Sequence, residues 1–276
     1  MGLHSGHIET GDVERSTVAR RDGHGMDAGT GCGHRKGLVD SRGGVRQVNV
    51  IICPVRAGLE MTQEAIESFY AQDIGDIYVL LVDNSPNHEM QKSLRYNGCI
   101  HANEPMGVSK SWNTALGSIF ESTSHVLVCN NDIVLRQDAY RLLLEDGGGF
   151  VTCVGDANRD AIWGEPRPLD KRPHPDFACY LIRQWVWEKV GKFDETFKGA
   201  YCEDNDYHLR MHQAGVDAHC IGVPFYHRVS GTIKHLSDDD AIKVHNQAHA
   251  NREYFRQKWG CLPGDEKYYE YFKEQG

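Results

Sequence analysis

The sequence lacks an apolar run long enough to cross a membrane, and its cysteines form no recognisable framework. No stretch approaches the roughly 20 apolar residues that a membrane-spanning helix needs. The nine cysteines are scattered, odd in number and without a C-x-x-C pair, so they indicate neither a zinc ribbon nor a disulfide scaffold. We therefore expect a soluble chain in a reducing compartment, the cytoplasm.

The sequence also has no excess of basic over acidic residues. The formal net charge of -9 argues against a broad basic surface for nucleic acid. Residues 1–46 contain few large apolar residues and no periodicity, and they lack the apolar core of a secretory signal peptide. We expect a flexible leader there, with the folded domain beginning at residue 47.

The sequence that follows the leader alternates between strand and helix patterns. Short β-branched or apolar runs indicate strands, and apolar residues at helical spacing indicate helices. The expected strands are 48–55, 76–87 and 125–135, and the expected helices are 60–72, 107–122 and 136–146. This alternation predicts an α/β fold with a mostly parallel central sheet, helices on both faces, and ligands at the carboxyl ends of the strands.

The order is less regular after residue 150. Residues 177–191 indicate a strand running into a helix, 203–213 a helix, and 216–227 a strand that ends at His227. Residues 238–260 read as one long helix stopped by Gly260. We expect the main domain to span 47–235 and a helical extension to span 236–276.

Polar clusters follow two of the expected strands. Asp83 ends the second strand, where a carboxylate can accept hydrogen bonds from a base or ribose. Asn130, Asn131 and Asp132 end the third, where polar oxygens can share a divalent cation with phosphates. Each cluster taken alone also fits an ordinary turn or helix cap.

Three carboxylates crowd into the start of one helix, at Glu203, Asp204 and Asp206. One carboxylate there complements the helix dipole. Three repel one another unless a cation, a basic partner or a proton-transfer task uses them. Arg210, four residues after Asp206, lies on the same helical face and is expected to hold that carboxylate in place.

These segments together resemble the family 2 glycosyltransferases, which have the GT-A fold. The resemblance covers about 48–230 and rests on six loose motifs in the family's order. These are "VNVIICPV", "VDNSPN" for V-D-D-G-S, "NEPMGVSKSWNTAL" for N-x-x-x-G-x-x-x-x-x-N, "CNND" for D-x-D, "GKFDETF" with "EDNDYHLRMHQAG" for E-D…R…G, and the later histidine of "FYHRVSGT". The resemblance implies a nucleotide-sugar-binding half at 47–135 and an acceptor and catalytic half at 136–235.

Carried over residue by residue, the resemblance implies an inverting transfer of one sugar from a nucleoside-diphosphate-sugar, with UDP- or dTDP-sugars favoured. Asp204 matches the general base, with Glu203 beside it. Asp132 and His227 match positions that hold Mn²⁺ or Mg²⁺ on the diphosphate. The donor-binding positions are Pro54, Val55, Asp83, Asn103, Gly107, Lys110, Asn130 and Asn131. The acceptor stays open between a glycan, a lipid-linked sugar, a protein and a modified nucleic-acid base.

Two residues differ from the family's motifs, and these differences leave alternative functions open. Asn130 replaces the first aspartate of D-x-D, which lowers the charge available to a metal. Asn84 replaces the second aspartate of V-D-D, so the base is not carried over. A binding protein that has lost catalysis is one alternative, and a sugar nucleotidyltransferase is another, although its glycine-rich phosphate loop is missing. Candidate stacking faces for a sugar or base are Trp163, Trp185, Trp187 and Trp259.

Overall fold

The computed structural model describes residues 25–27, 48–101, 104–165 and 175–272. The leader expected at 1–46 therefore lies outside the described residues except for 25–27. Within the described ranges, no helix combines the length and the apolar character that crossing a bilayer requires.

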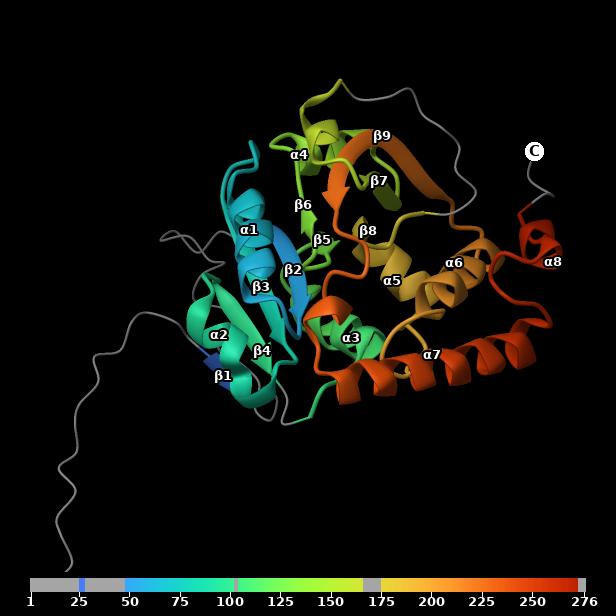
Figure 1. The fold of residues 1–276 in the computed structure, drawn as a ribbon. Helices are drawn as coiled ribbons and strands as arrows, with labels where there is room; N and C mark the ends of the chain where they lie inside the picture. Colours follow the sequence, from blue (N-terminus) through green and yellow to red (C-terminus); the bar gives the residue numbers. More distant parts are fainter. Residues whose placement is uncertain (1–24, 28–47, 102–103, 166–174, 273–276) are drawn as a thin grey trace, which may run out of the picture.

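The core of the molecule is one mixed β-sheet, shown in Figure 1, with the strand order β1-β4-β3-β2-β5-β8-β7-β9-β6. The strands are β1 (Gly25–Asp27), β2 (Asn49–Val55), β3 (Ile77–Asp83), β4 (Gly98–His101), β5 (His125–Cys129), β6 (Ile133–Val134), β7 (Phe150–Asp156), β8 (Cys179–Arg183) and β9 (Ala218–His227). The strands from β1 to β5 pair in parallel, as do β7 and β9, whereas β8 and β6 run antiparallel to their neighbours. The predicted α/β fold with a mostly parallel sheet is confirmed.

Helices cover both faces of this sheet. They are α1 (Leu59–Tyr70), α2 (Glu89–Ser93), α3 (Val108–Ile119), α4 (Ala139–Asp146), α5 (Gln184–Val190), α6 (Glu203–Gln213), α7 (Asp238–Trp259) and α8 (Glu266–Glu270). Short 3-10 turns η2 (Pro86–His88), η3 (Arg159–Trp163) and η4 (Ile233–His235) complete the elements. The expected helix 203–213 has the observed bounds of α6, and the long C-terminal helix ends before Gly260, whose φ is 72°.

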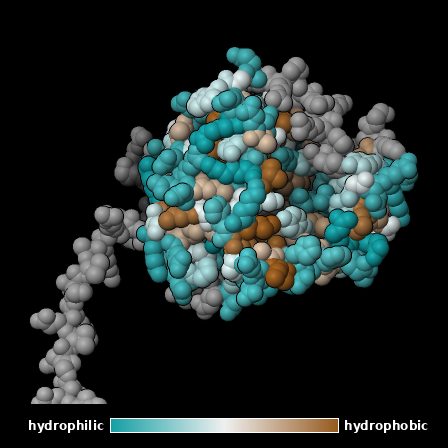
Figure 2. Space-filling view, in the orientation of Figure 1, coloured by the Kyte–Doolittle hydropathy of each residue, from teal (hydrophilic) through white to brown (hydrophobic). Residues whose placement is uncertain are grey.

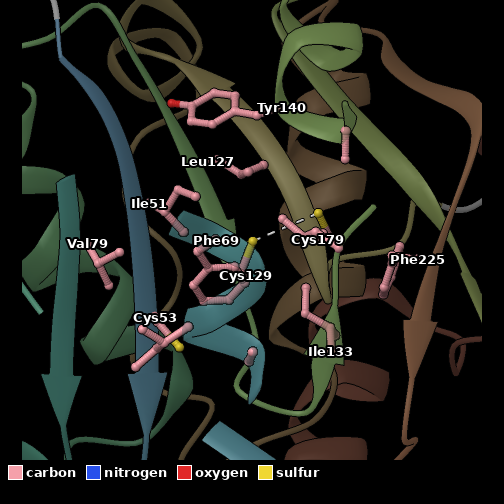
Figure 3. Packing of buried hydrophobic residues seen from close by; sticks show 14 of the residues in the cluster. Ile51, Cys53, Phe69, Val79, Leu127, Cys129, Ile133, Tyr140, Cys179 and Phe225 are labelled. Carbon is pink, nitrogen blue, oxygen red and sulfur yellow. Dashed lines mark hydrogen bonds between the residues drawn. The ribbon is translucent and has the colours of Figure 1, made fainter. Parts of the chain in front are cut away.

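Strand alternation divides the core into two layers. Successive side chains of a strand point to opposite faces of a sheet. Ile51 and Cys53 of β2 therefore pack in the layer that α1, α2 and α4 cover, whereas Val50 and Ile52 pack in the layer that α3, α5 and α6 cover. Figure 3 shows part of the first layer, where Cys129 of β5 and Cys179 of β8 face each other with their sulfur atoms 3.9 Å apart.

The C-terminal helix α7 packs against α6 and the segment before it. Phe255 and Trp259 of α7 share a buried cluster with Phe197 and with Leu209 of α6. Figure 1 shows α7 in red along the lower edge of the molecule, with α6 above it. The helical extension therefore shares a core with the residues that lead into the acidic segment.

Candidate active site

A cavity of about 580 Å³ opens where β2, β5 and β9 end. Parallel strands bring their carboxyl ends to one edge of a sheet, which is where α/β proteins bind ligands. The residues expected in the site that line this cavity are Pro54, Val55, Gly107, Asn130, Asn131, Asp132, Glu203, Asp204 and His227. The structure therefore gathers most of the expected site residues around one space of ligand size.

Asp132 and His227 form an ion pair on one side of the cavity. The imidazole Nε2 lies 3.6 Å from Oδ1 of Asp132, and the N–H of Gly231 donates to Oδ2 at 3.0 Å. They are neighbours because β6, which begins just after Asp132, pairs with the end of β9, with Ile133 opposite His227. The local sheet register therefore fixes this pair.

The two groups of this pair shift each other's pKa. Burial raises the pKa of Asp132, but His227 and the N–H of Gly231 outweigh burial, so the pKa falls below that of an ordinary aspartate. Burial lowers the pKa of His227, but the carboxylates of Asp132 and Asp176 outweigh it, so the pKa rises above that of an ordinary histidine. The pair favours a carboxylate beside an imidazolium.

Asn130 and Asn131 differ in how their side chains are used. The Asn131 amide donates to the Ala57 carbonyl at 3.0 Å and to Oγ1 of Thr62 at 2.8 Å, and its oxygen accepts from Thr232 at 2.7 Å. Asn131 therefore ties the cavity wall together. The backbone N–H of Asn130 donates to the Ala178 carbonyl at 2.9 Å, and Asn130 lines the cavity.

Asp176 lines the cavity although the sequence did not single it out. It precedes β8, which runs antiparallel to β5, so β8 begins at the edge where β5 ends. Its carboxylate accepts hydrogen bonds from the N–H groups of Gly155 at 3.2 Å and Ala178 at 3.0 Å. The apolar pattern of a buried strand does not reveal its direction, so no feature of the sequence indicated Asp176.

Glu203 and Asp204 begin α6 and line the same cavity. Glu203 is 6% exposed, and burial with the neighbouring Asp204 charge raises its pKa well above the ordinary value. Burial and the charge of Asp176 also raise the pKa of Asp204, although its Oδ1 accepts from the Asn205 N–H at 2.8 Å. Carboxyl groups with raised pKa values suit proton transfer near neutral pH.

Two buried polar atoms of cavity-lining residues have no hydrogen-bond partner among the described residues: Nε1 of Trp112 and Oε2 of Glu203. Trp112 is 2% exposed, and its ring packs against Tyr180 and Phe193 at centroid distances of 5.4 and 4.8 Å. A buried polar group without a partner costs about 1–3 kcal/mol. A ligand hydroxyl is the kind of group that offsets this cost, because it both donates and accepts.

Other expected residues have structural roles or lie elsewhere. Asp83 is fully buried and does not line the cavity, because its two oxygens accept from the N–H groups of Ser85 and Gln91, both at 2.8 Å. Lys110 is exposed on α3 and also does not line the cavity. Asn103 lies outside the described residues. Asp83 thus supports a turn and Lys110 faces solvent, so neither of these expected donor contacts lines the cavity.

The motif asparagine Asn113 is also structural. Its amide nitrogen donates to the Phe193 carbonyl at 2.9 Å and to the Glu195 carboxylate at 2.8 Å, and its oxygen accepts from the Phe193 N–H at 2.8 Å. Asn113 thereby fixes the loop between α5 and the acidic segment. The expected Asp206–Arg210 pair is confirmed, with Nε 2.9 Å from Oδ2.

Sequence reasoning missed two further kinds of cavity residue. Arg56 follows β2 directly and brings a cation to the cavity, where it also pairs with Asp240 of α7 at 3.4 Å. Its position after a strand was the available signal. The tryptophan that lines the cavity is Trp112, whereas Trp163, Trp185, Trp187 and Trp259, which were the predicted stacking faces, do not.

Part of the cavity lining is apolar. Val229, Ile233, Leu236 and Val244 line it, and Val229 is 55% exposed. Figure 2 shows hydrophobic residues gathered near the centre of this face, over the end of β9, η4 and the start of α7. The segment after β9 thus adds an apolar border to a polar site.

Few side chains of the cavity can act as ligands for a divalent metal. Within the described ranges, no group of three or more His, Cys, Asp or Glu side chains forms a metal cluster. Asp132 and His227 supply one carboxylate and one imidazole. This set fits a metal of the Mg²⁺ or Mn²⁺ class only if substrate phosphates and water complete its coordination, which is the usual way such sites hold nucleotides.

No family model matches the sequence, and no curated protein does. Among solved structures, S. aureus TarS in complex with UDP is 16% identical, with a TM-score of 0.48 over 74% of this chain. A Pyrobaculum calidifontis mannosyltransferase in complex with GDP-Man and Mn²⁺ is 18% identical, with a TM-score of 0.49 over 79% of this chain and 76% of its own. Drosophila β1,4-galactosyltransferase 7 in complex with xylobiose is 13% identical, with a TM-score of 0.44 over 63% of this chain and 64% of its own. The chain spans 65% of the length of the TarS structure.

Proposed function

We propose that this protein is an inverting glycosyltransferase that moves one sugar from a nucleoside-diphosphate-sugar, with UDP- or dTDP-sugars favoured, to an acceptor hydroxyl. One observation carries the proposal. A single cavity at the carboxyl ends of the strands is lined by the Asp132–His227 pair and also by the Glu203–Asp204 pair. The first pair suits a departing diphosphate, and the second suits removal of the acceptor proton.

The diphosphate end of the reaction is assigned to Asp132, His227 and Arg56. A nucleoside diphosphate gains negative charge as the bond to the sugar breaks, and fixed positive charge near it lowers the barrier. A bound Mn²⁺ or Mg²⁺, held by Asp132 and His227, would supply Lewis-acid stabilisation of that charge. When no metal is bound, the His227 imidazolium, which Asp132 stabilises, supplies positive charge instead. The guanidinium of Arg56 supplies positive charge in either case.

The acceptor end is assigned to Asp204 as general base. Its carboxylate removes the proton of the acceptor hydroxyl, while the acceptor oxygen attacks the anomeric carbon from the face opposite the diphosphate, which inverts that carbon. The raised pKa of Asp204 brings its basicity closer to the pH at which it works. Glu203 orients the acceptor or Asp204 from the adjacent position.

The remaining donor contacts are assigned to Pro54, Val55, Gly107, Asn130 and Asn131. All five line the cavity, where backbone groups and amides can meet a base, a ribose and phosphates. The expected cytoplasmic location and Asn103 as a donor contact stay predictions.

A catalytically inactive nucleotide-sugar-binding protein is the second candidate. The observation that favours it is the neutral side chain of Asn130 beside Asp132 in the cavity, which leaves less negative charge for a metal. Both candidates bind a nucleotide, but only the transferase needs the carboxylates of α6. A mutation at Asp204 therefore separates them.

The first experiment is a thermal unfolding series of the full chain with UDP, dTDP, GDP and their sugar conjugates, with and without Mn²⁺. A ligand at 100 times its Kd stabilises by about 2.7 kcal/mol, which corresponds to a rise of about 5–10 °C in Tm for a chain of this size. We expect a Mn²⁺-dependent shift with one nucleotide, lost in Asp132→Ala and kept in Asp204→Asn. Asp239→Asn, an exposed change on α7, is the matched control.

Activity then separates the candidates. The nucleotide-sugar that shifts Tm most is incubated with the wild type and Asp204→Asn, and release of the nucleoside diphosphate to water or to an acceptor panel is followed. Turnover by the wild type and its loss in Asp204→Asn support the transferase. Nucleotide binding without any turnover favours the inactive binding protein, and no shift with any nucleotide contradicts both.

A further inference from the structure

The backbone just before Glu203 and Asp204 is held in an unfavourable conformation. Gly199 has a φ of 67°, and the two residues that precede α6, Tyr201 and Cys202, have φ angles of 80° and 72°. Positive φ angles suit glycine but cost free energy in residues with a side chain, most of all in bulky ones. Two consecutive residues of this kind persist only where the surroundings hold them.

The group that holds this segment is the side chain of Asn251, from the middle of α7. Its Oδ1 accepts from the Lys198 N–H at 3.0 Å. Its Nδ2 shares its two hydrogens among the carbonyls of Lys198, Ala200 and Tyr201, at 2.8, 2.9 and 3.0 Å. Asn251 is 3% exposed. Among the residues that the structure describes, this buried side-chain amide therefore bonds only to the segment that leads into α6.

The opposite side of the same segment lies against the start of α3. The N–H of Val108 donates to the Gly199 carbonyl at 2.7 Å. A Cβ on Gly107 would lie 2.9 Å from the Gly199 nitrogen. The two segments of the chain are therefore in contact through their backbones. Residues 198–202 therefore contact Gly107, which lines the cavity, as well as α7.

We propose that Asn251 is a positioning residue that sets the placement of Glu203 and Asp204 in the cavity. Its bonds fix the residues immediately before α6, and the first turn of α6 carries both carboxylates. The inference rests on the proposed function, in which these carboxylates handle the acceptor proton. It gives α7 a role in positioning the catalytic carboxylates although Asn251 itself does not line the cavity.

Other contacts attach α7 to the protein independently of Asn251. Lys258 lies 2.7 Å from the Asp206 carboxylate and 2.8 Å from that of Asp194, and the Trp259 indole donates to Asp206 at 3.0 Å. Phe255 and Trp259 remain in their buried cluster. A change at Asn251 should therefore loosen residues 198–204 without releasing the helix.

The test compares Asn251→Ala with Asn246→Ala in the full chain. Asn246 is an exposed asparagine on the same helix, so both variants lose an amide and gain the same helix former. Amide hydrogen exchange is followed first, because it requires no substrate. Asn251→Ala should accelerate exchange at residues 203–206 at least about tenfold, with the β2 and β3 amides unchanged, and Asn246→Ala should have no such effect.

The functional readout uses UDP with Mn²⁺ for binding, and turnover of whichever of UDP-glucose, UDP-galactose, UDP-N-acetylglucosamine and GDP-mannose binds the wild type. Asn251→Ala should keep the Kd for UDP within about twofold and lower kcat by about 10- to 100-fold, the loss expected from displacing a catalytic group by about 1 Å. The pH dependence of kcat should also shift, because the carboxylates leave their present surroundings. Asn251→Asp, which keeps one acceptor but loses the amide donors, should not restore kcat.

Three outcomes test whether Asn251 positions Glu203 and Asp204. Unchanged exchange at 203–206 overturns the proposal whatever the activity is. Faster exchange with unchanged kcat and pH profile, measured well below the Tm of the variant, also overturns it, because Asn251 then serves stability alone. If no nucleotide binds the wild type, the proposed function fails, while the exchange result still decides whether Asn251 fixes the start of α6.

Discussion

The imidazole of His227 lies 3.6 Å from the carboxylate of Asp132, across the junction of β6 and β9. Their opposite pKa shifts show that each favours the charged form of the other. The pair can act on a diphosphate in two ways, through a shared cation or through the imidazolium itself. These two ways differ in their dependence on pH.

The first prediction concerns UDP binding with and without metal. Mn²⁺ binds a neutral imidazole, so UDP affinity in Mn²⁺ should rise with pH through the His227 pKa, which lies above the ordinary value of 6.5. Without metal, the affinity should fall over the same range, because the imidazolium loses its charge. Titration calorimetry between pH 5.5 and 8.5 measures both slopes.

His227→Gln should flatten both slopes, and Asp132→Asn should lower UDP affinity in Mn²⁺ by about 10- to 100-fold, since a hydrogen bond to a charged group is worth about 1.5–3 kcal/mol. Parallel slopes with and without Mn²⁺ would show that His227 does not contact the metal.

The second prediction concerns the stability cost of Glu203. Because its folded-state pKa is raised, the folded chain binds more protons than the unfolded chain above the ordinary glutamate value of 4.5. Stability is therefore lost as pH rises from that value toward the raised pKa, by about 1.4 kcal/mol per pH unit in that window. Glu203→Gln should raise the Tm at pH 7.5, with a smaller gain at pH 5.

Thermal unfolding at several pH values checks the second prediction, with Glu121→Gln as an exposed control. Each kcal/mol corresponds to about 2–4 °C in Tm. A gain that is the same at pH 5 and pH 7.5 would contradict a raised pKa at Glu203. Turnover should fall in the same variant, so stability and activity change in opposite directions.

The third prediction concerns sugar recognition by Trp112. Its indole N–H has no partner among the described residues, so Trp112→Phe removes a donor while keeping most of the packing against Phe193. We expect little change in the affinity for UDP and a loss of about 5- to 10-fold for the corresponding UDP-sugar, as for one hydrogen bond of about 1 kcal/mol. Trp185→Phe, on an exposed side chain outside the cavity, is the control. Equal losses for UDP and UDP-sugar would contradict a contact with the sugar.

The fourth prediction concerns Asp83. Its removal in Asp83→Ala leaves the N–H groups of Ser85 and Gln91 without their acceptor, at a cost of about 1–3 kcal/mol for each group left unsatisfied. The Tm should fall by about 4–24 °C. Nucleotide affinity, measured well below that Tm, should stay within about twofold, and Lys110→Ala should change neither quantity. A selective loss of nucleotide binding would restore Asp83 to the donor site.

The acidic segment could be read from the sequence because its signals are local. The signals are the crowded carboxylates, the helical spacing from residue 203 to 213 and the glycines that end helices, and each of them involves residues close in sequence. The helix α6 has the expected bounds. The same locality identified β2, β3 and β5 and the polar residues that follow them.

Asp176 and Asn251 depended on long-range pairing. Asp176 reaches the cavity because β8 runs antiparallel to β5, a choice that the apolar pattern of β8 does not reveal, since buried strands of either direction read alike. The sequence does not distinguish Asn251 from the other polar residues of a long helix. Its role becomes visible only in the packing of α7 on residues 198–201.

The sequence by itself determined the alternation of strands and helices, because periodicity is a short-range property. Its resemblance to a known family identified Asp132, Glu203, Asp204 and His227 as candidates. The tertiary structure alone decided that these residues share one cavity with Arg56 and Trp112, and that Asp83 and Lys110 stand outside it. The physical reason is that burial, strand direction and hydrogen-bond partners belong to pairs of segments far apart in the chain, and only packing brings those segments together.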